Sequence, residues 1–71
     1  MTNKIRVTVK FFSGKTRAVE VEKGEKISGV LKKLGLNPIE VIVIRGGTVI
    51  PDEETVDADT VLEVFSVISG G

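Results

Sequence analysis

The sequence of 71 residues predicts an α+β fold in which a mixed β-sheet packs on one helix. Valine and isoleucine together account for 19 residues, and such β-branched side chains favour a pleated sheet. Apolar and polar residues alternate along several segments, whereas helical periodicity occurs in one segment only. Because one helix covers only one face of a sheet, we expect the other face to meet water.

The first third of the chain predicts a β-hairpin. Residues 4–12 alternate strictly between apolar and polar side chains, which is typical of a half-buried strand. Residues 13–15 contain a turn signal, and residues 17–22 alternate again. The side chains that we expect to face the core are Ile5, Val7, Val9, Phe11, Val19 and Val21.

The apolar spacing then changes to a helical period. Lys32 and Lys33 lie in the expected last turn, where cations interact favourably with the helix dipole. Gly35 is a candidate left-handed cap, and Pro38 prevents the helix from continuing. Gly29 costs about 1 kcal/mol relative to alanine, and a close approach to the sheet is the one reason that the sequence offers for it. One helical face carries Ile27, Val30, Leu31 and Leu34.

A second hairpin follows the helix. Residues 40–45 are apolar on both faces, as a central strand often is. Gly46 and Gly47 predict a tight turn into a short strand at residues 48–50, which Pro51 ends.

The last part of the chain predicts a loop and one more strand. Residues 52–60 form an acidic loop with Val56 as its inward anchor, and residues 61–68 form the last strand. We expect the first and last strands to be adjacent and parallel, because this element order fits a β-grasp architecture. The expected organisation is one β-grasp domain over residues 1–68 and a flexible tail over residues 69–71.

Composition excludes several functions. The chain contains no cysteine and no histidine, which removes zinc sites, disulfides and Ser-His or Cys-His catalysis. Asp57 and Asp59 do not have the spacing of a calcium loop, so we expect no metal site. Ten basic and ten acidic side chains give a net charge of zero, which argues against nucleic acid as a partner. A chain this short favours a binding or carrier role over an enzyme.

The sequence also gives an expectation for location. Residues 1–10 lack the apolar run of a signal peptide, and the longest apolar run, residues 41–44, is too short to span a bilayer. We therefore expect a soluble, cytoplasmic protein with no membrane partner.

The uncovered sheet face carries more apolar residues than expected. Glu40 and Glu63 mark the faces of their strands that meet water, and apolar residues share those faces. A contiguous apolar patch on a small protein often marks a partner site. The alternative is that strand ends curl and loops cover these side chains. The candidate partner-binding residues are Phe12, Ile42, Ile44, Phe65 and Val67.

Charge is segregated along the chain. Residues 1–34 hold nine basic and three acidic side chains, a net charge of +6, whereas residues 35–71 hold one basic and seven acidic side chains, a net charge of −6. The two halves could complement each other internally. The other interpretation is an acidic surface near the last strand that meets a basic partner.

The chain ends in Ser69, Gly70 and Gly71, directly after a predicted strand. Three extended residues reach about 10 Å, and glycines without Cβ atoms can enter a channel that excludes other residues. Such a tail could present its terminal carboxylate to another protein. A frayed end is the alternative interpretation.

With this tail, the chain resembles the ubiquitin-like sulfur carriers of the ThiS and MoaD families and the archaeal ubiquitin-like modifiers related to them. The most specific similarity is at residues 56–64, leading to residues 68–71, where Ala58 replaces the usual glycine of an Asp-Gly-Asp turn. Residues 9–12 are similar to the first strand of MoaD, and residues 45–51 are similar to the hairpin of ThiS.

The resemblance implies that Gly71 is the acyl and sulfur carrier and that Gly70 gives access to the partner's channel. In this family a separate ubiquitin-activating-enzyme-like adenylyltransferase uses ATP and magnesium to activate the carboxylate, so the chain itself binds no cofactor. A sulfur nucleophile then gives a thiocarboxylate for thiamin, molybdopterin or tRNA thiolation, with a sulfurtransferase or an acceptor synthase as a further partner. Two alternatives stay open: a modifier joined to target-protein lysines through Gly71, and a β-grasp binding module with an incidental tail.

Overall fold

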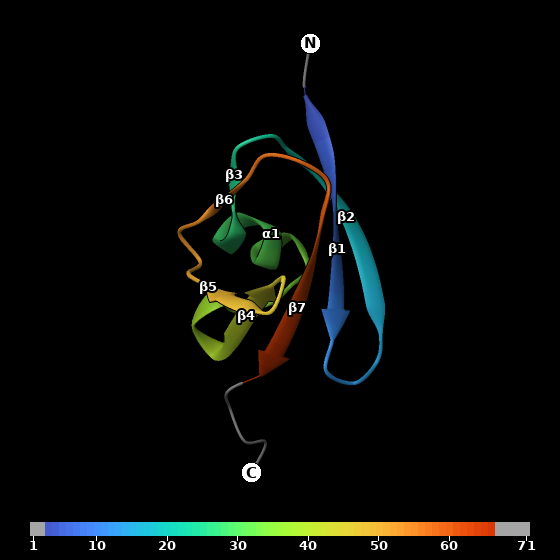
Figure 1. Cartoon of the computed structure of the whole chain (residues 1–71), viewed down its shortest axis with the longest axis vertical. Helices are drawn as coiled ribbons and strands as arrows, with labels where there is room; N and C mark the ends of the chain where they lie inside the picture. The colour runs from blue at the N-terminus through green and yellow to red at the C-terminus, as the bar shows by residue number, and fades with distance from the viewer. Residues whose placement is uncertain (1–2, 67–71) are drawn as a thin grey trace.

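A computed structural model of the chain describes residues 3–66 as a five-stranded mixed sheet packed on one α-helix, α1 (Ile27–Lys33). Figure 1 shows the helix on one side of the sheet. The predicted α+β, β-grasp arrangement is therefore confirmed. Across the sheet the strands are β2 (Thr16–Glu22), β1 (Lys4–Phe11), β7 (Thr60–Ser66), β4 (Val41–Arg45) and β5 (Thr48–Ile50).

The first and last strands of this sheet lie side by side and run in the same direction (Figure 1). Their register runs from Val7 opposite Thr60 to Phe11 opposite Val64. The other neighbours in the sheet are antiparallel. The parallel pair predicted from topology is thus present, and it places β7 at the centre of the sheet.

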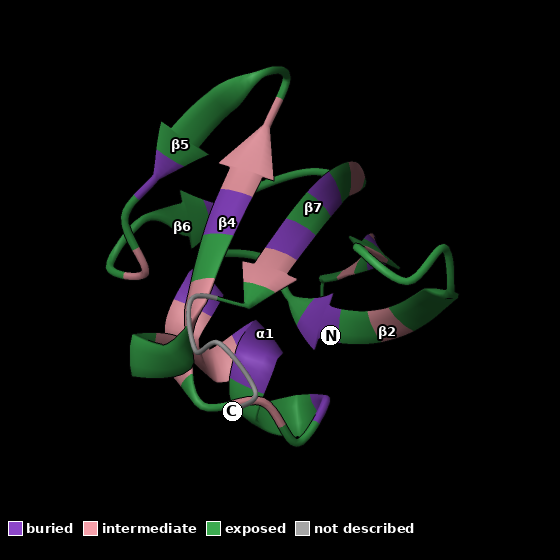
Figure 2. Cartoon of the chain, turned by 90° about the horizontal axis from the view of Figure 1, so that it is seen from below, coloured by how far each residue is buried: buried purple, intermediate pink, exposed green. Residues whose placement is uncertain are grey.

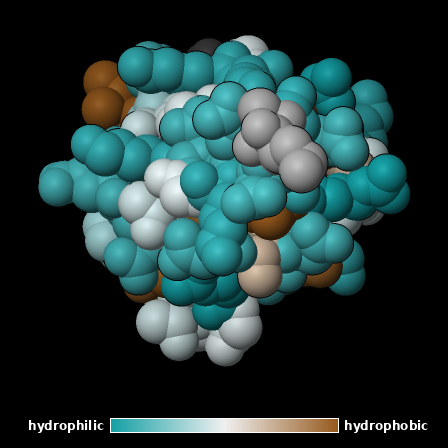
Figure 3. Space-filling model, turned by 90° about the horizontal axis from the view of Figure 1, so that it is seen from above, coloured by the Kyte–Doolittle hydropathy of each residue, from teal (hydrophilic) through white to brown (hydrophobic). Residues whose placement is uncertain are grey.

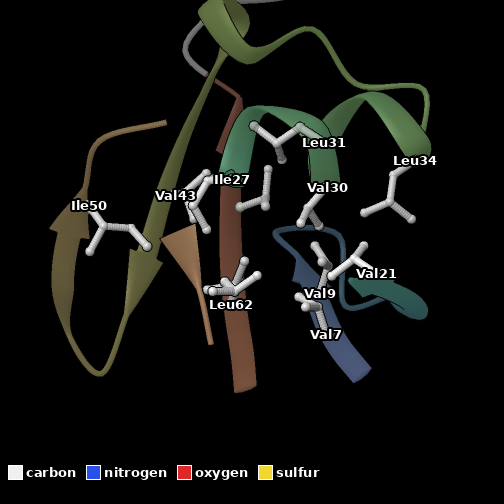
Figure 4. Close-up of a cluster of buried hydrophobic side chains, with 12 residues drawn as sticks. Val7, Val9, Val21, Ile27, Val30, Leu31, Leu34, Val43, Ile50 and Leu62 are labelled. Atoms are coloured by element: carbon white, nitrogen blue, oxygen red, sulfur yellow. The ribbon is translucent and has the colours of Figure 1, made fainter. Parts of the chain in front are cut away.

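The core lies between the sheet and α1. Buried and exposed positions alternate along β7, as Figure 2 shows, because successive side chains of a strand point to opposite faces. The close-up in Figure 4 shows helix side chains pointing toward those of the strands. The buried residues are Val7, Val9, Val21, Ile27, Val30, Leu31, Leu34, Val43, Ile50, Val56, Leu62 and Val64.

The end of α1 follows the predicted capping pattern. Gly35 has a φ of +78°, a left-handed conformation that costs an L-residue with a side chain about 1–2 kcal/mol. Its N–H donates to the Lys32 carbonyl at 3.0 Å, and the Leu36 N–H donates to the Leu31 carbonyl at 2.9 Å. These bonds satisfy carbonyl groups that the helix end leaves without helical partners.

The start of α1 is capped in a way that the sequence did not indicate. Lys26 stands at the N-cap and makes no side-chain cap bond. Instead, the N–H of Ile27 donates to the Glu54 carbonyl at 2.8 Å, and the N–H of Ser28 donates to the Asp52 carbonyl at 2.9 Å. The acidic loop therefore supplies the acceptors that the first helical turn needs.

Part of the predicted loop at residues 52–60 is also sheet. The two-residue strands β3 (Glu25–Lys26) and β6 (Thr55–Val56) form an antiparallel pair separate from the main sheet. Val56 is 1% exposed, as predicted for the anchor of this loop. Two-residue strands leave no alternation pattern, so sequence periodicity could not predict this pair.

Two local expectations were wrong. Glu40 does not begin a strand, because it ends the 3₁₀-helix η1 (Pro38–Glu40), and its carboxylate accepts from the Asn37 side-chain amide at 3.3 Å. Gly29 does not lie closest to the main sheet. A Cβ at this position would lie 2.7 Å from the carboxyl carbon of Glu25, a residue of the short strand β3.

The described part of the last strand ends at Ser66. Residues 67 and 68 of the predicted strand, the domain boundary at residue 68 and the tail at residues 69–71 lie outside the described residues. Within residues 3–66, no helix is long and apolar enough to cross a membrane.

Substituting the core-facing side of α1 should destabilise the fold far more than substituting the neighbouring exposed position. Leu31 is 0% exposed, so we expect Leu31→Ala to lower the free energy of unfolding by about 2–5 kcal/mol. Lys32 is exposed, and Lys32→Ala should change it by no more than about 0.5 kcal/mol. Urea unfolding followed by circular dichroism measures both, and equal losses would contradict the position of the core.

Candidate docking face and chain exit

The sheet face turned away from α1 carries a row of three large apolar side chains. The rings of Phe12 and Phe65 lie 5.6 Å apart between centroids, at an interplanar angle of 51°. Ile42 lies directly opposite Phe65 in the antiparallel β4–β7 register, so the two side chains share a face. Three residues that the sequence placed in one patch are therefore neighbours.

A second row lies next to the first. Ile44 is opposite Glu63 on one side and opposite Val49 of β5 on the other. Val49 is 64% exposed, and Val61, two positions before Glu63 on β7, is 49% exposed. The sequence analysis missed both valines. The alternation of strand residues could have identified both valines. Ile50 follows Val49 and Leu62 follows Val61, and both of these following residues face the core, so the valines face away from it.

The predicted patch residues differ in exposure. Phe12 is 82% exposed and Ile42 is 39% exposed. Ile44 and Phe65 are half-buried, since their neighbours on adjacent strands cover part of each side chain. Val67 lies outside the described residues. We refer to Phe12, Ile42, Ile44, Val49, Val61 and Phe65 as the apolar face.

Charged residues of the same sheet face oppose one another across the strands. Lys4 is opposite Glu22 and Arg6 is opposite Glu20 in the β1–β2 register, while Lys10 is opposite Glu63 in the β1–β7 register. Opposite charges across strands each contribute roughly 0.2–1 kcal/mol. Of these pairs only Lys10–Glu63 joins the first half of the chain to the second, so both interpretations of the charge segregation stay predictions.

A hollow lies beside the acidic loop and not on the apolar face. Its volume is about 460 Å³, and Arg45, Glu54, Asp57 and Asp59 are among its lining residues. Arg45 and Glu54 form an ion pair at 3.7 Å, and Asp59 accepts from the backbone N–H of Arg6 at 2.8 Å. No group of three or more metal-ligating side chains occurs in the described part of the chain.

The end of the molecule where β7 begins has a different surface from the end where β7 finishes. Figure 3 shows that hydrophilic side chains cover most of this end and that hydrophobic atoms appear there only in small separate spots. The paired row of Phe12, Phe65 and Ile42 instead belongs to the end where β7 finishes. The chain therefore leaves the centre of the sheet beside its exposed aromatic pair.

Solved structures define the class of this protein: it has the ubiquitin-like β-grasp fold. A protein designed on the basis of ubiquitin has a TM-score of 0.76 and 22% identity, and the similarity covers 96% of this chain and 94% of that one. A chain in a crystal structure of a pParkin–pUb–UbcH7 complex has a TM-score of 0.71 and 25% identity, covering 90% of this chain and 23% of the other.

Sequence comparisons then identify the family. The family described as Small archaeal modifier protein 2 matches residues 5–68, and the chain belongs to this family. Sulfur carrier protein TtuB of Thermus thermophilus is 42% identical over 55 residues, covering 78% of this chain and 85% of that protein. An uncharacterized protein of Archaeoglobus fulgidus is 34% identical over 68 residues, covering 94% and 100%. The resemblance to ubiquitin-fold sulfur carriers and archaeal modifiers is thereby confirmed.

The exposed end of the aromatic pair should contribute little to stability. We expect Phe12→Ala to lower the free energy of unfolding by about 0.5–1.5 kcal/mol, the value of an aromatic pair, because the ring is 82% exposed. Val9→Ala removes two buried carbons on the opposite face and should cost about 2 kcal/mol. Thermal or urea unfolding measures both losses of stability. If Phe12→Ala lowered the free energy of unfolding much more than Val9→Ala does, Phe12 would instead be a major contributor to the stability of the fold.

Proposed function

We propose that this protein is a ubiquitin-like sulfur carrier whose C-terminal Gly71 is activated by a partner enzyme. The observation that carries the proposal is the 42% identity over 55 residues to a protein named as a sulfur carrier. Membership of a family of small archaeal modifier proteins supports a carrier over a catalyst. The absence of histidine and cysteine from the whole sequence also fits a protein whose chemistry is done by others.

The reaction would take place on the terminal carboxylate. A carboxylate is a poor acyl donor because its oxygen is a poor leaving group. Attack of the Gly71 carboxylate on the α-phosphate of ATP, with magnesium on the activating enzyme, forms an acyl-adenylate and releases pyrophosphate. A sulfur nucleophile at the oxidation level of hydrosulfide then attacks the acyl carbon and displaces AMP. The product is a thiocarboxylate at Gly71. The sulfur can pass to thiamin, to molybdopterin or to a tRNA base.

The position at which the central strand β7 ends supports this role. Ser66 closes the central strand opposite Val41, and the five residues that follow can span at most about 17 Å when extended. An enzyme that reacts with Gly71 must therefore come close to this end of the sheet. Gly70 has no Cβ atom, which suits a narrow channel leading to the reaction centre.

The partner surface in this proposal is the apolar face next to the chain exit. Phe12 and Ile42 are exposed, and Phe65 and Ile44 continue the same surface inward. Val67 follows Phe65 by two residues in the sequence and completes the proposed contact set. The partners are an adenylyltransferase of the ubiquitin-activating type and then a sulfurtransferase or an acceptor synthase, and we propose that all of them meet in the cytoplasm.

A second function is favoured by the name of the family itself, which describes its members as modifiers. In that case the activated Gly71 would acylate the amino group of a lysine on a target protein. Both functions need the same activated glycine and differ only in the nucleophile, so one chain could serve both.

Removing Gly71 should abolish activation without affecting the fold. We expect the ΔGly71 protein to give no ATP–pyrophosphate exchange with its activating enzyme, because the adenylated carboxylate would have to form on a different, misplaced residue. The circular dichroism and unfolding curve should match the unaltered protein. Intact mass spectrometry of the unaltered protein from its native cells should show the mass gain of one oxygen-to-sulfur exchange at Gly71.

Other outcomes of these measurements would lead to different functions. Lysine-linked conjugates that capture Gly71, without any sulfur exchange, would replace sulfur carriage by protein modification. Retention of all partner binding and of the cellular role in the ΔGly71 protein would make the chain a β-grasp binding module, and both carrier functions would be wrong.

A further inference from the structure

One carboxylate lies within the apolar face. Glu63 is on β7, two residues after Val61 and two residues before Phe65. The three side chains therefore lie on the same side of the strand. Ile44 lies opposite Glu63 on β4. Three sides of this exposed carboxylate are therefore apolar, and the fourth side is occupied by Lys10 of β1.

No close ion pair neutralises Glu63 in the part of the chain that the structure describes. The one pair within 4.0 Å among residues 3–66 is Arg45–Glu54, which lies at the acidic loop. Lys10 shares the register position of Glu63, but its ammonium does not come within that distance of the Glu63 carboxylate.

This position has a physical consequence for any protein that covers the face. Glu63 lies opposite Ile44 and two residues from Phe65. A partner that contacts Ile44 and Phe65 at the same time therefore also covers Glu63. Burying a carboxylate without a partner costs several kcal/mol, more than the burial of one apolar side chain returns. The covering surface must therefore supply a positive group at this point.

We infer that the docking partner places a cationic side chain against Glu63, so that this carboxylate sets which enzyme surface the apolar face accepts. This inference rests on the proposed function and commits to one occupant, the adenylyltransferase that activates Gly71. An arginine guanidinium fits best, because it forms two parallel hydrogen bonds with a carboxylate and is less strongly hydrated than an ammonium.

Lys10 offers a competing explanation for Glu63. If Glu63 served only to pair with Lys10 across the strands, its loss would remove a surface pair worth no more than about 1 kcal/mol of stability. The loss of Lys10 would then have the same effect on stability, and neither loss would change how an enzyme binds. The two explanations therefore differ in the KM of activation.

The test is steady-state ATP–pyrophosphate exchange with the purified ubiquitin-activating-type adenylyltransferase from the same genome, with this protein as the varied substrate. We expect Glu63→Lys to raise the KM at least about tenfold at low salt, since truncation or reversal of a covered charge pair costs 2–5 kcal/mol. The kcat at saturation should stay within about twofold, because docking contacts act equally on bound substrate and transition state. Higher salt should reduce the difference in KM between Glu63→Lys and the unaltered protein, because salt screens the interaction between charges.

Three further variants complete the experiment. Glu53→Lys makes the same charge change at an exposed position of the acidic loop, and its KM should stay within about twofold of the unaltered protein. Glu63→Gln removes the charge without placing a second cation beside Lys10, so it tests the inference even if Glu63→Lys is poorly folded. Lys10→Gln should leave the KM unchanged or lower it, because it removes competition for the carboxylate.

Three outcomes overturn the inference, and they can be told apart. Equal KM values for Glu63→Lys, Glu63→Gln and the unaltered protein, with normal exchange in all, would refute the inference and leave the proposed function intact. No exchange with the unaltered protein would refute the proposed function and remove the enzyme as the occupant. Dimerisation of the protein that is lost in Glu63→Gln, detected by sedimentation, would show that a second copy covers the face.

Discussion

A seven-residue helix covers only one face of a five-stranded sheet. The two sheet faces therefore differ, because one packs on the helix and the other meets water. The buried hydrophobic core of the described residues lies between the covered face and the helix, and on the sheet it extends from Val7 on β1 to Ile50 on β5. The uncovered face must then be stable in water and still have the β-branched and aromatic side chains that strands favour. Cross-strand charge pairs on the β1–β2 side and apolar rows on the β7–β4–β5 side share that face. The apolar face thus follows in part from the residue types that strands favour.

The central place of β7 connects this surface to the proposed chemistry. Parallel pairing with β1 extends to Val64, and antiparallel pairing with β4 extends to Ser66. Backbone pairing therefore positions the end of the described strand, together with the buried side chains of Leu62 and Val64. In the proposed function, a carrier needs no catalytic group of its own, because the partner enzymes act on its terminal carboxylate.

Sequence patterns predicted most of the fold because most of it is periodic. The alternation in residues 4–12, the helical spacing from Ile27 to Leu34 and the glycine cap at Gly35 each have a direct local cause. The β3–β6 pair and η1 could not be predicted from periodicity, since two or three residues show no period, and β3 and β6 are also distant from each other in the sequence. The candidate patch was predicted in part, because register, which a single strand does not reveal, was needed to place Val49 and Glu63 on either side of Ile44.

The carbonyl caps at the start of α1 have one more consequence. The acceptors for Ile27 and Ser28 are backbone oxygens of Glu54 and Asp52, so their strength does not depend on which side chains those two positions carry. A conventional cap would fail with a single substitution at the N-cap residue. Here the loop has to keep its path but not its composition. The segment from residue 52 to residue 54 could therefore change its charge while the helix that it supports stays in place.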